Sequence, residues 1–279
     1  MTTVVPQAVE FEQSPEPSGK PPLTPRFRLR GFYALGLQIV CVVIFLAVWH
    51  IASHNGWVDP LIAGSPTGTW NAFWEYTSSP EAWASMRATG WAVLLTFIIG
   101  STLGTVFGLA LGLFPLLGTV LGPFMAPINS IPRIALAPLF IAWFGLTTTS
   151  KVVLGVSVVF FILAENARGA VRSVDQDILT LSKVMGIRGR SLVWKIVLPS
   201  VVPTMFAGVR LSYTYALLGV VASEMIAASN GVGQDVVRYS TSFQIDTVFA
   251  ILLIIMLVTI AVNALFSALE RRLLVWQEQ

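Results

Sequence analysis

Long apolar runs without a charged residue constrain this chain more than any other feature of its sequence. Residues 31–58, 88–132 and 247–269 contain no Asp, Glu, Lys or Arg. A helix of about 20 apolar residues crosses a lipid bilayer, so each run can hold at least one span. Hydrophobic residues make up 55% of the 279 residues, which is more than one soluble core could bury. The sequence therefore predicts an all-α, polytopic membrane protein.

Six membrane-spanning helices account for the apolar runs. We place the first in the early part of residues 31–58, the second after residue 88, and the others at 117–145, 150–167, 201–228 and 247–269. Arginines flank the start of the first span and the ends of the fourth and sixth. Because positive flanks favour the cytoplasmic side, both termini and the polar segment 173–199 are expected in the cytoplasm.

The polar parts of the chain argue against several other classes of protein. The first 25 residues are rich in Pro, Glu, Gln and Ser and lack an apolar signal core, so residues 1–30 are expected to form a disordered cytoplasmic tail. The net charge of +3 is scattered over flanks and loops, which argues against nucleic acid as a partner. Cys41 is the single cysteine, so no intramolecular disulfide can form. His50 and His54 have a metal-binding spacing but no third ligand, and no metal site is predicted.

A short helix is predicted between the first two spans. Ser65 followed by Pro66 is typical of an N-cap with proline at the first helical position. Trp70, Phe73 and Trp74 then fall on one face of the helix. That face suits either a helix lying in the outer membrane interface or a packed external loop.

Glycine recurs every fourth residue in the second span. Such a small-residue stripe lets a neighbouring helix approach closely. We therefore predict a helix-packing role rather than chemistry for Gly100, Gly104, Gly108 and Gly112.

The third span combines three prolines, at positions 127, 132 and 138, with Arg133 about halfway along it. A charged side chain at mid-depth must face the bundle interior, a partner or a water-filled cavity, and broken helices are tolerated where they line such a cavity. Arg133 is therefore the leading candidate for a solute pathway, and Glu224 of the fifth span is the second. The alternative is a structural ion pair of Arg133, with Glu224 as its partner. Arg210 is separated from Glu224 by fourteen positions, or roughly 21 Å along one helix, so each needs a partner elsewhere.

The segment 173–199 is the longest polar interruption between apolar runs. Its apolar spacing predicts two short helices around a turn, because Gly186 and Gly189 break the pattern and it resumes before Pro199. Asp175 is a candidate N-cap for the first of these helices. The simplest alternative is a loop that only connects two spans.

Gly186 is followed by nine residues, Ile196, one residue and Leu198-Pro199, and this spacing resembles the cytoplasmic "EAA" loop of importer-type ABC transporter permeases. Thr180, Leu181 and Ser182 stand where that family usually has Glu, Ala and Ala. The stretches LIAGSPTGTWNAFWE, IALAPLFIAWFG, GVRLSYTYALLGVVASEM and ALERRL resemble the nitrate/sulfonate/taurine/bicarbonate branch. The resemblance extends over about residues 49–269.

The resemblance implies a type-1 ABC importer permease fold in a bacterial cytoplasmic (inner) membrane. It implies residues 31–81 as a first transmembrane helix with an external loop, residues 82–270 as the transmembrane core, and residues 271–279 as a cytoplasmic tail. The expected partners are a second copy of the chain, two cytoplasmic ATP-binding subunits, an extracytoplasmic solute-binding protein and membrane lipid. The loop would dock as a helix in a groove of the ATPase. The residues expected to couple the loop to the ATPase are Asp177, Lys183, Gly186, Arg188 and Pro199.

The expected function is ATP-driven import of a small solute by alternating access, with no cofactor bound by this chain and ATP bound by a partner subunit. The sequence contains no phosphate-binding G-x-x-x-x-G-K-[ST] loop, because its single Gly-Lys pair is Gly19-Lys20 before Pro21. The branch and Arg133 favour a sulfonate, nitrate, taurine or carboxylate, whereas related permeases also carry neutral vitamin precursors. A stand-alone secondary transporter and a polytopic membrane enzyme are the remaining alternatives.

Overall fold

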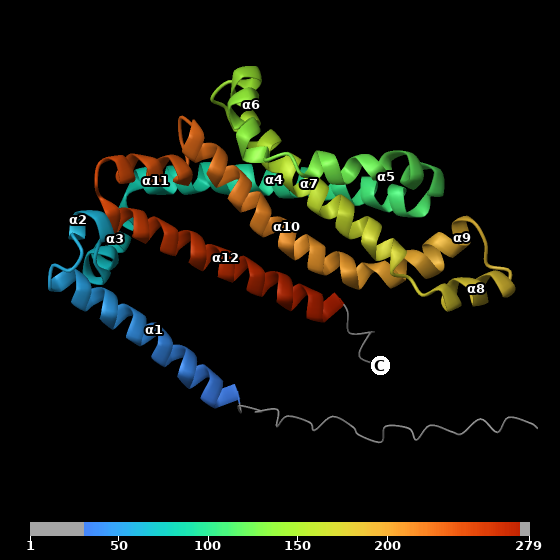
Figure 1. Cartoon of the computed structure of the whole chain (residues 1–279), viewed down its shortest axis with the longest axis horizontal. Coiled ribbons are helices and arrows are strands. Elements are labelled where there is room, and N and C mark those ends of the chain that lie inside the picture. The colour runs from blue at the N-terminus through green and yellow to red at the C-terminus, as the bar shows by residue number, and fades with distance from the viewer. Residues whose placement is uncertain (1–30, 274–279) are drawn as a thin grey trace, which may run out of the picture. The chain divides into compact units, whose positions relative to one another are not determined.

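The structure, a computed structural model, describes residues 31–273, and its regular elements are all helices (Figure 1). Residues 1–30 and 274–279, which hold most of the predicted tails, lie outside the described residues. Five helices of the described part are long and apolar enough to cross a membrane, and a bent pair makes six if it counts as one span. The all-α, six-span prediction is thereby confirmed. The long helices are α1 (Gly31–His54), α4 (Pro80–Leu113), α7 (Thr148–Arg172), α10 (Leu198–Ile226) and α12 (Ile245–Leu273), and the bent pair is α5 (Pro115–Asn129) with α6 (Ala137–Phe144).

The chain divides into two units at Ala47 and Val48, inside α1. As far as it is described, the first unit is the early part of α1, where apolar side chains such as Leu37, Ile39 and Phe45 are each more than half exposed. An apolar helix exposed to this extent requires lipid or a protein partner around it. All the sites considered below lie in the second unit.

Helices α4, α7 and α10 form the centre of the second unit, with α4 packed along α7 and α7 packed along α10. The glycine stripe of α4 faces α7 along its whole length. A methyl group on Gly100 would lie 2.8 Å from Val159 Cβ, and one on Gly104 would lie 2.5 Å from the carbonyl oxygen of Phe160. Gly108 and Gly112 approach α7 as closely. The two backbones can lie this near only because the stripe carries no side chains.

The third span is broken once, between α5 and α6, which are bent by 83°. Pro127 was predicted to break the span, but Pro123 and Pro127 both lie inside α5. The break comes before Pro132, which forces the preceding residue out of the helical conformation. Pro138 lies in the first turn of α6, where backbone N–H groups have no helical partner and a proline is tolerated.

The polar segment folds into α8 (Gln176–Val184) and α9 (Arg190–Leu192), separated by a turn. Gly186 and Gly189 have φ angles of +80° and +56°, which favour glycine. Asp175 caps α8, as predicted, by accepting a hydrogen bond from the backbone N–H of Asp177.

Helix α9 is not a separate short helix, in contrast to the prediction of two short helices around a turn. It continues through the π-helical turn η2 (Val193–Val197) into α10, giving an unbroken helical stretch from Arg190 to Ile226. A proline ring clashes with the carbonyl four residues earlier in a regular α-helix. The wider π turn just before Pro199 relieves that clash.

The segment between α10 and α12, which joins the fifth and sixth predicted spans, contains the helix α11 (Val232–Thr241). Val232 and Val236 of α11 pack with Tyr76 and Ile251 in one apolar cluster. Burial of this narrow apolar face stabilises α11. The helix is short and mostly polar, so its sequence alone does not reveal it. Two further short helices, α2 (Pro60–Ala63) and α3 (Pro66–Ser78), lie between α1 and α4.

Helix α3 begins as the sequence predicts. The Ser65 hydroxyl accepts a hydrogen bond from the backbone N–H of Gly68, and Pro66 is the first helical residue. Trp70 and Trp74 are more than half exposed, whereas Phe73 packs against the cluster around Tyr76. The aromatic face of α3 is therefore divided between the protein and its surroundings.

Candidate functional site

Arg133 lies at the break between α5 and α6, where it begins the short 3-10 helix η1 (Arg133–Leu136). Its guanidinium donates to the carbonyl oxygen of Ser157 on α7 at 2.7 Å and to the Asn129 side-chain oxygen at 3.1 Å. A third hydrogen bond reaches the carbonyl of Ile128, and the guanidinium lies 4.1 Å from the centre of the Phe161 ring. All these partners are neutral. Within residues 31–273, Arg133 forms no ion pair.

Arg133 lines a groove of about 400 Å³ between the break, α7 and α10. The groove combines this one guanidinium with a side-chain amide and a phenol in otherwise apolar walls. Such a lining suits a small solute with one anionic group and an apolar body. The lining residues are Asn129, Arg133, Ile134, Val158, Ile162, Tyr215, Leu218 and Gly219.

Glu224 does not line this groove. It is buried near the end of α10, and its carboxylate lies 3.0 Å from the Lys151 ammonium, which is also almost completely buried. The predicted alternative, an ion pair between Arg133 and Glu224, is therefore wrong. The Glu224 carboxylate pairs instead with Lys151, which lies near the start of α7. Arg133 has only neutral partners.

Further hydrogen bonds complete the environment of this buried ion pair. The Thr89 hydroxyl and the backbone N–H of Gly233 donate to the Glu224 carboxylate at 2.9 and 3.0 Å. Lys151 also donates to the side-chain oxygen of Asn230 at 2.9 Å. Because every charged atom has a partner, this arrangement ties α4, α7, α10 and α11 together rather than forming an open binding site.

Two other acidic residues of the spans lie beside arginines. Arg210 pairs with Glu270 of α12. Glu165 lies 3.6 Å from Arg168 one turn later on α7. The prediction that Arg210 and Glu224 each pair elsewhere is confirmed.

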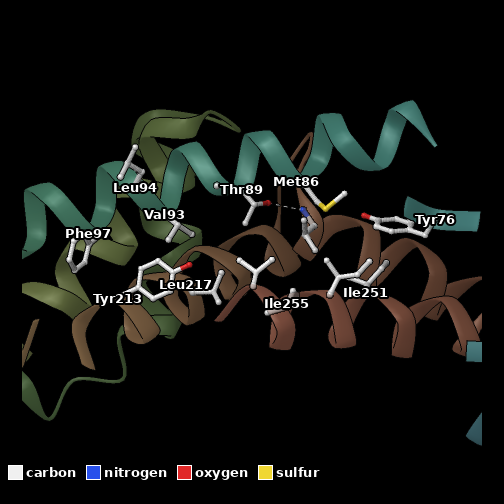
Figure 2. Close-up of a pocket in the computed structure, with 14 residues that line it drawn as sticks. Tyr76, Met86, Thr89, Val93, Leu94, Phe97, Tyr213, Leu217, Ile251 and Ile255 are labelled. Carbon is white, nitrogen blue, oxygen red and sulfur yellow. Dashed lines mark hydrogen bonds between the residues drawn. The ribbon is translucent and has the colours of Figure 1, made fainter. Parts of the chain in front are cut away.

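A second hollow, of about 350 Å³, lies between α4, α10 and α12 (Figure 2). Its walls are apolar apart from three hydroxyl groups. The Thr89 hydroxyl accepts a hydrogen bond from the Val232 backbone at 2.8 Å, and the Tyr76 hydroxyl donates to Asp235 at 2.8 Å (Figure 2 shows the first). Burial, together with this bond to Asp235, raises the pKa of Tyr76, so its phenol stays protonated. No charged residue lines this cavity, so the groove at Arg133 is the better candidate for an anionic solute.

The predicted coupling residues are all exposed; four lie on the segment between α7 and α10, and Pro199 is the second residue of α10. Several large apolar side chains beside them are also exposed. Val184 and Met185 at the end of α8 are 80% and 70% exposed, and Trp194 is 62% exposed. An apolar patch of this kind, rimmed by charges, is typical of a protein interface. The exposed coupling residues are Asp177, Lys183, Gly186, Arg188 and Pro199.

Lys151, Thr89 and Asn230 were not predicted as functional residues. A signal was present in the sequence, because Lys151 begins the fourth predicted span and Glu224 ends the fifth. When two neighbouring spans are antiparallel, the start of one lies at the same membrane depth as the end of the other, as Lys151 and Glu224 do.

A bundle of apolar helices with a broken span, a half-buried arginine at the break and an exposed polar loop is typical of the membrane subunit of a transporter. The chain belongs to the family of binding-protein-dependent transport system inner membrane components, whose sequence model matches residues 100–275. It is a transport subunit without an ATPase site of its own. The family implies an ABC transporter that also has ATP-binding subunits and a substrate-binding protein.

Similar proteins span nearly the whole chain. SsuC, a transport permease protein of Bacillus subtilis, is 29% identical over 250 residues, which are 90% of this chain and 90% of SsuC. The riboflavin transport system permease protein RibX of Chloroflexus aurantiacus is 29% identical over 244 residues, 88% of this chain and 91% of RibX. A chain of the inward-facing MetNI methionine ABC transporter has the same fold, with a TM-score of 0.60 at 17% identity over 70% of this chain and 98% of that chain.

Proposed function

We propose that this chain is the permease of an ATP-driven importer of a small organic or inorganic anion, and that two copies form the pore. The main support for an anionic substrate is the environment of the Arg133 guanidinium. It lines an open groove between the break, α7 and α10, and its partners there are neutral: three hydrogen-bond acceptors and one aromatic ring. A positive charge in an apolar environment favours an anion beside it and opposes a cation.

The relatives support a small solute and leave two substrate classes to compare. SsuC is named for the transport of aliphatic sulfonates, which are anions with an apolar body. RibX is named for riboflavin, which is uncharged. The groove favours the first class, because an uncharged solute would gain nothing from the charge of Arg133.

The proposal assigns the segment with α8 and α9 to ATPase coupling. Its exposed charges, Lys183 and Arg188, flank the apolar patch formed by Val184 and Met185. A helix with an apolar tip and a charged rim fits a groove on a soluble partner. The positive-inside rule supports a cytoplasmic position for this segment and for both termini, and the external end would face a solute-binding protein.

Uptake into vesicles containing the chain, its ATPase subunits and its binding protein tests the proposal. The probes are a radiolabelled short alkanesulfonate and riboflavin, each with and without ATP. The chain as it stands should take up the sulfonate only with ATP. Uptake without ATP would instead support a secondary transporter.

Replacement of Arg133 tests the substrate class. Arg133→Gln should lower sulfonate uptake at least tenfold, since one charge-assisted hydrogen bond contributes about 1.5–3 kcal/mol. Arg133→Lys should retain more uptake because it keeps the charge. Arg87→Gln, which removes an exposed arginine from α4, is the matched control. Riboflavin uptake, or equal activity of Arg133→Gln and the control, would refute the anion assignment.

A further inference from the structure

Two arginines at the end of α7 face a groove that no part of the proposed function uses. The groove, of about 570 Å³, lies between the junction of α4 with α5 and the end of α7. Its lining is more polar than that of the groove at Arg133 or of the apolar hollow beside Thr89. The lining residues are Leu111, Gly112, Pro115, Gly118, Thr119, Gly122, Pro123, Arg168 and Arg172, which we call the α5–α7 groove.

Arg168 is the deeper of the two arginines, and its guanidinium lacks the partners that a buried cation needs. Its side chain is 13% exposed, and its Nε atom is buried without a hydrogen-bond partner. Its nearest counter-charge is the half-exposed Glu165 carboxylate at 3.6 Å, too far for a hydrogen bond. Within the described chain, the side chain of Arg168 forms no hydrogen bond. The guanidinium of an arginine has five N–H donors. Those of Arg168 are therefore free to donate to an acceptor from outside the chain.

The guanidinium is held in this place by the shape of α5. A methyl group on Gly122 would lie 2.5 Å from Arg168 Nη2, so the side chain crosses α5 where that helix carries no side chain. Arg172 lies one turn further on, is exposed, and has no ion pair within the described residues. The first turn of α5 also borders the groove, and the partial positive charge of a helix N-terminus adds to that of the arginines.

An exposed apolar stripe runs along α5 beside the groove. Leu116, Val120 and Phe124 recur every fourth residue and are 76%, 54% and 60% exposed. On the same helix, Pro115, Thr119 and Pro123 line the groove. Each apolar residue therefore lies next to one that lines the groove.

We propose that the α5–α7 groove binds the phosphate of an anionic phospholipid, with an acyl chain along the stripe formed by Leu116, Val120 and Phe124. Arg168 and Arg172 hold the phosphate, and the apolar stripe holds the chain. A soluble phosphate would gain from the charges alone, whereas a lipid gains from both features. The positive-inside rule assigns this end of α7 to the cytoplasmic leaflet, where basic pockets between helices bind anionic headgroups.

Native mass spectrometry of the delipidated transporter, purified with its ATPase subunits, tests this site. The probes are phosphatidylglycerol, a diacylglycerol with the same acyl chains, and glycerol phosphate. Phosphatidylglycerol alone should remain bound. Arg168→Gln with Arg172→Gln should weaken its binding at least tenfold, and the exposed Arg172→Gln alone should weaken it severalfold without disturbing the fold. Val120→Gln should weaken binding with both arginines intact.

The matched control is Arg271→Gln with Arg272→Gln, which removes two exposed arginines from the end of α12. An equal loss of lipid in this control would show non-specific attraction and overturn the proposal. Equal binding of glycerol phosphate would overturn it in favour of a soluble anion. Absence of a lipid adduct would also overturn it. That result would favour a second copy of the chain as the partner that covers the apolar stripe. Binding is measured without uptake, so failure here is distinguishable from failure of the proposed transport function.

Discussion

Replacement of Gly104 by alanine should separate α4 from α7 and destabilise the bundle. The added methyl group would lie 2.5 Å from the carbonyl oxygen of Phe160 and 2.9 Å from Leu163 Cβ, whereas ordinary contacts are 3.4–4 Å. The helices must therefore move apart by about 1 Å. A backbone carbonyl cannot rotate away, and a gap of that size removes about a quarter to a half of the attraction between the facing atoms.

The magnitude follows from two opposing effects. Overpacking of this kind costs about 1–3 kcal/mol, and alanine in a helix is favoured over glycine by roughly 0.5–1 kcal/mol. Gly90→Ala is the matched control, because Gly90 lies on the same helix and has nothing within 4 Å of its added methyl group. The helix preference is common to both variants, so their difference should equal the packing cost.

The assay is unfolding of the purified chain in mixed micelles as the fraction of dodecyl sulfate is raised, followed by tryptophan fluorescence. Gly104→Ala should unfold about 1–3 kcal/mol more easily than Gly90→Ala. Gly90→Ala should equal or slightly exceed the unchanged chain. Equal stability of the two variants would refute the close contact between α4 and α7.

Three further predictions concern the buried ion pair, the coupling segment and α3. Lys151→Met should cost about 3–5 kcal/mol because it strands the Glu224 carboxylate, and Lys151→Met with Glu224→Met should recover most of that loss in the same unfolding assay. Gly186→Val, at φ +80°, should abolish ATP-driven uptake while the membrane helices remain folded by circular dichroism. Asp246→Ala removes the acceptor of the Ser65 backbone N–H, 2.7 Å away, and should speed hydrogen exchange in α3 without changing it in α7.

The spans and the glycine stripe of α4 could be predicted because both depend on local spacing. An apolar run of sufficient length is a helix in a membrane wherever its neighbours lie. A stripe of glycine at every fourth residue implies a close neighbour, although the sequence does not say which helix that is. The structure identifies α7 as that neighbour, through carbonyl oxygens such as that of Phe160.

The pairing of charges could not be predicted in the same way. Arg133 and Glu224 were considered together because both are charged within predicted spans, but pairing depends on depth and rotation about each helix axis. Glu224 lies near the end of α10 and Lys151 near the start of α7, so these two meet at one end of the bundle. Arg133 lies at a break, where free backbone carbonyls such as that of Ser157 replace a carboxylate.

Helix α11 and the π turn were missed for a related reason. Both are stabilised by contacts rather than by their own sequence pattern. Val232 and Val236 stabilise α11 only because Tyr76 and Ile251 cover them. The π turn before Pro199 lets one helix continue where the local rule for proline predicts a boundary.

The unbroken helix from Arg190 to Ile226 connects the proposed coupling segment to the buried ion pair. Its 37 residues extend about 55 Å if helical throughout. At its far end Glu224 is fixed to α7 by Lys151, so a displacement at the coupling end would tilt the helix about that ion pair. Tyr215 and Gly219, which line the groove at Arg133, lie between the two ends. Gly219 lies so close to Gly155 of α7 that an added methyl group would be 3.1 Å from its Cα. A tilt would therefore change the width of the groove, and the buried ion pair would serve as the pivot.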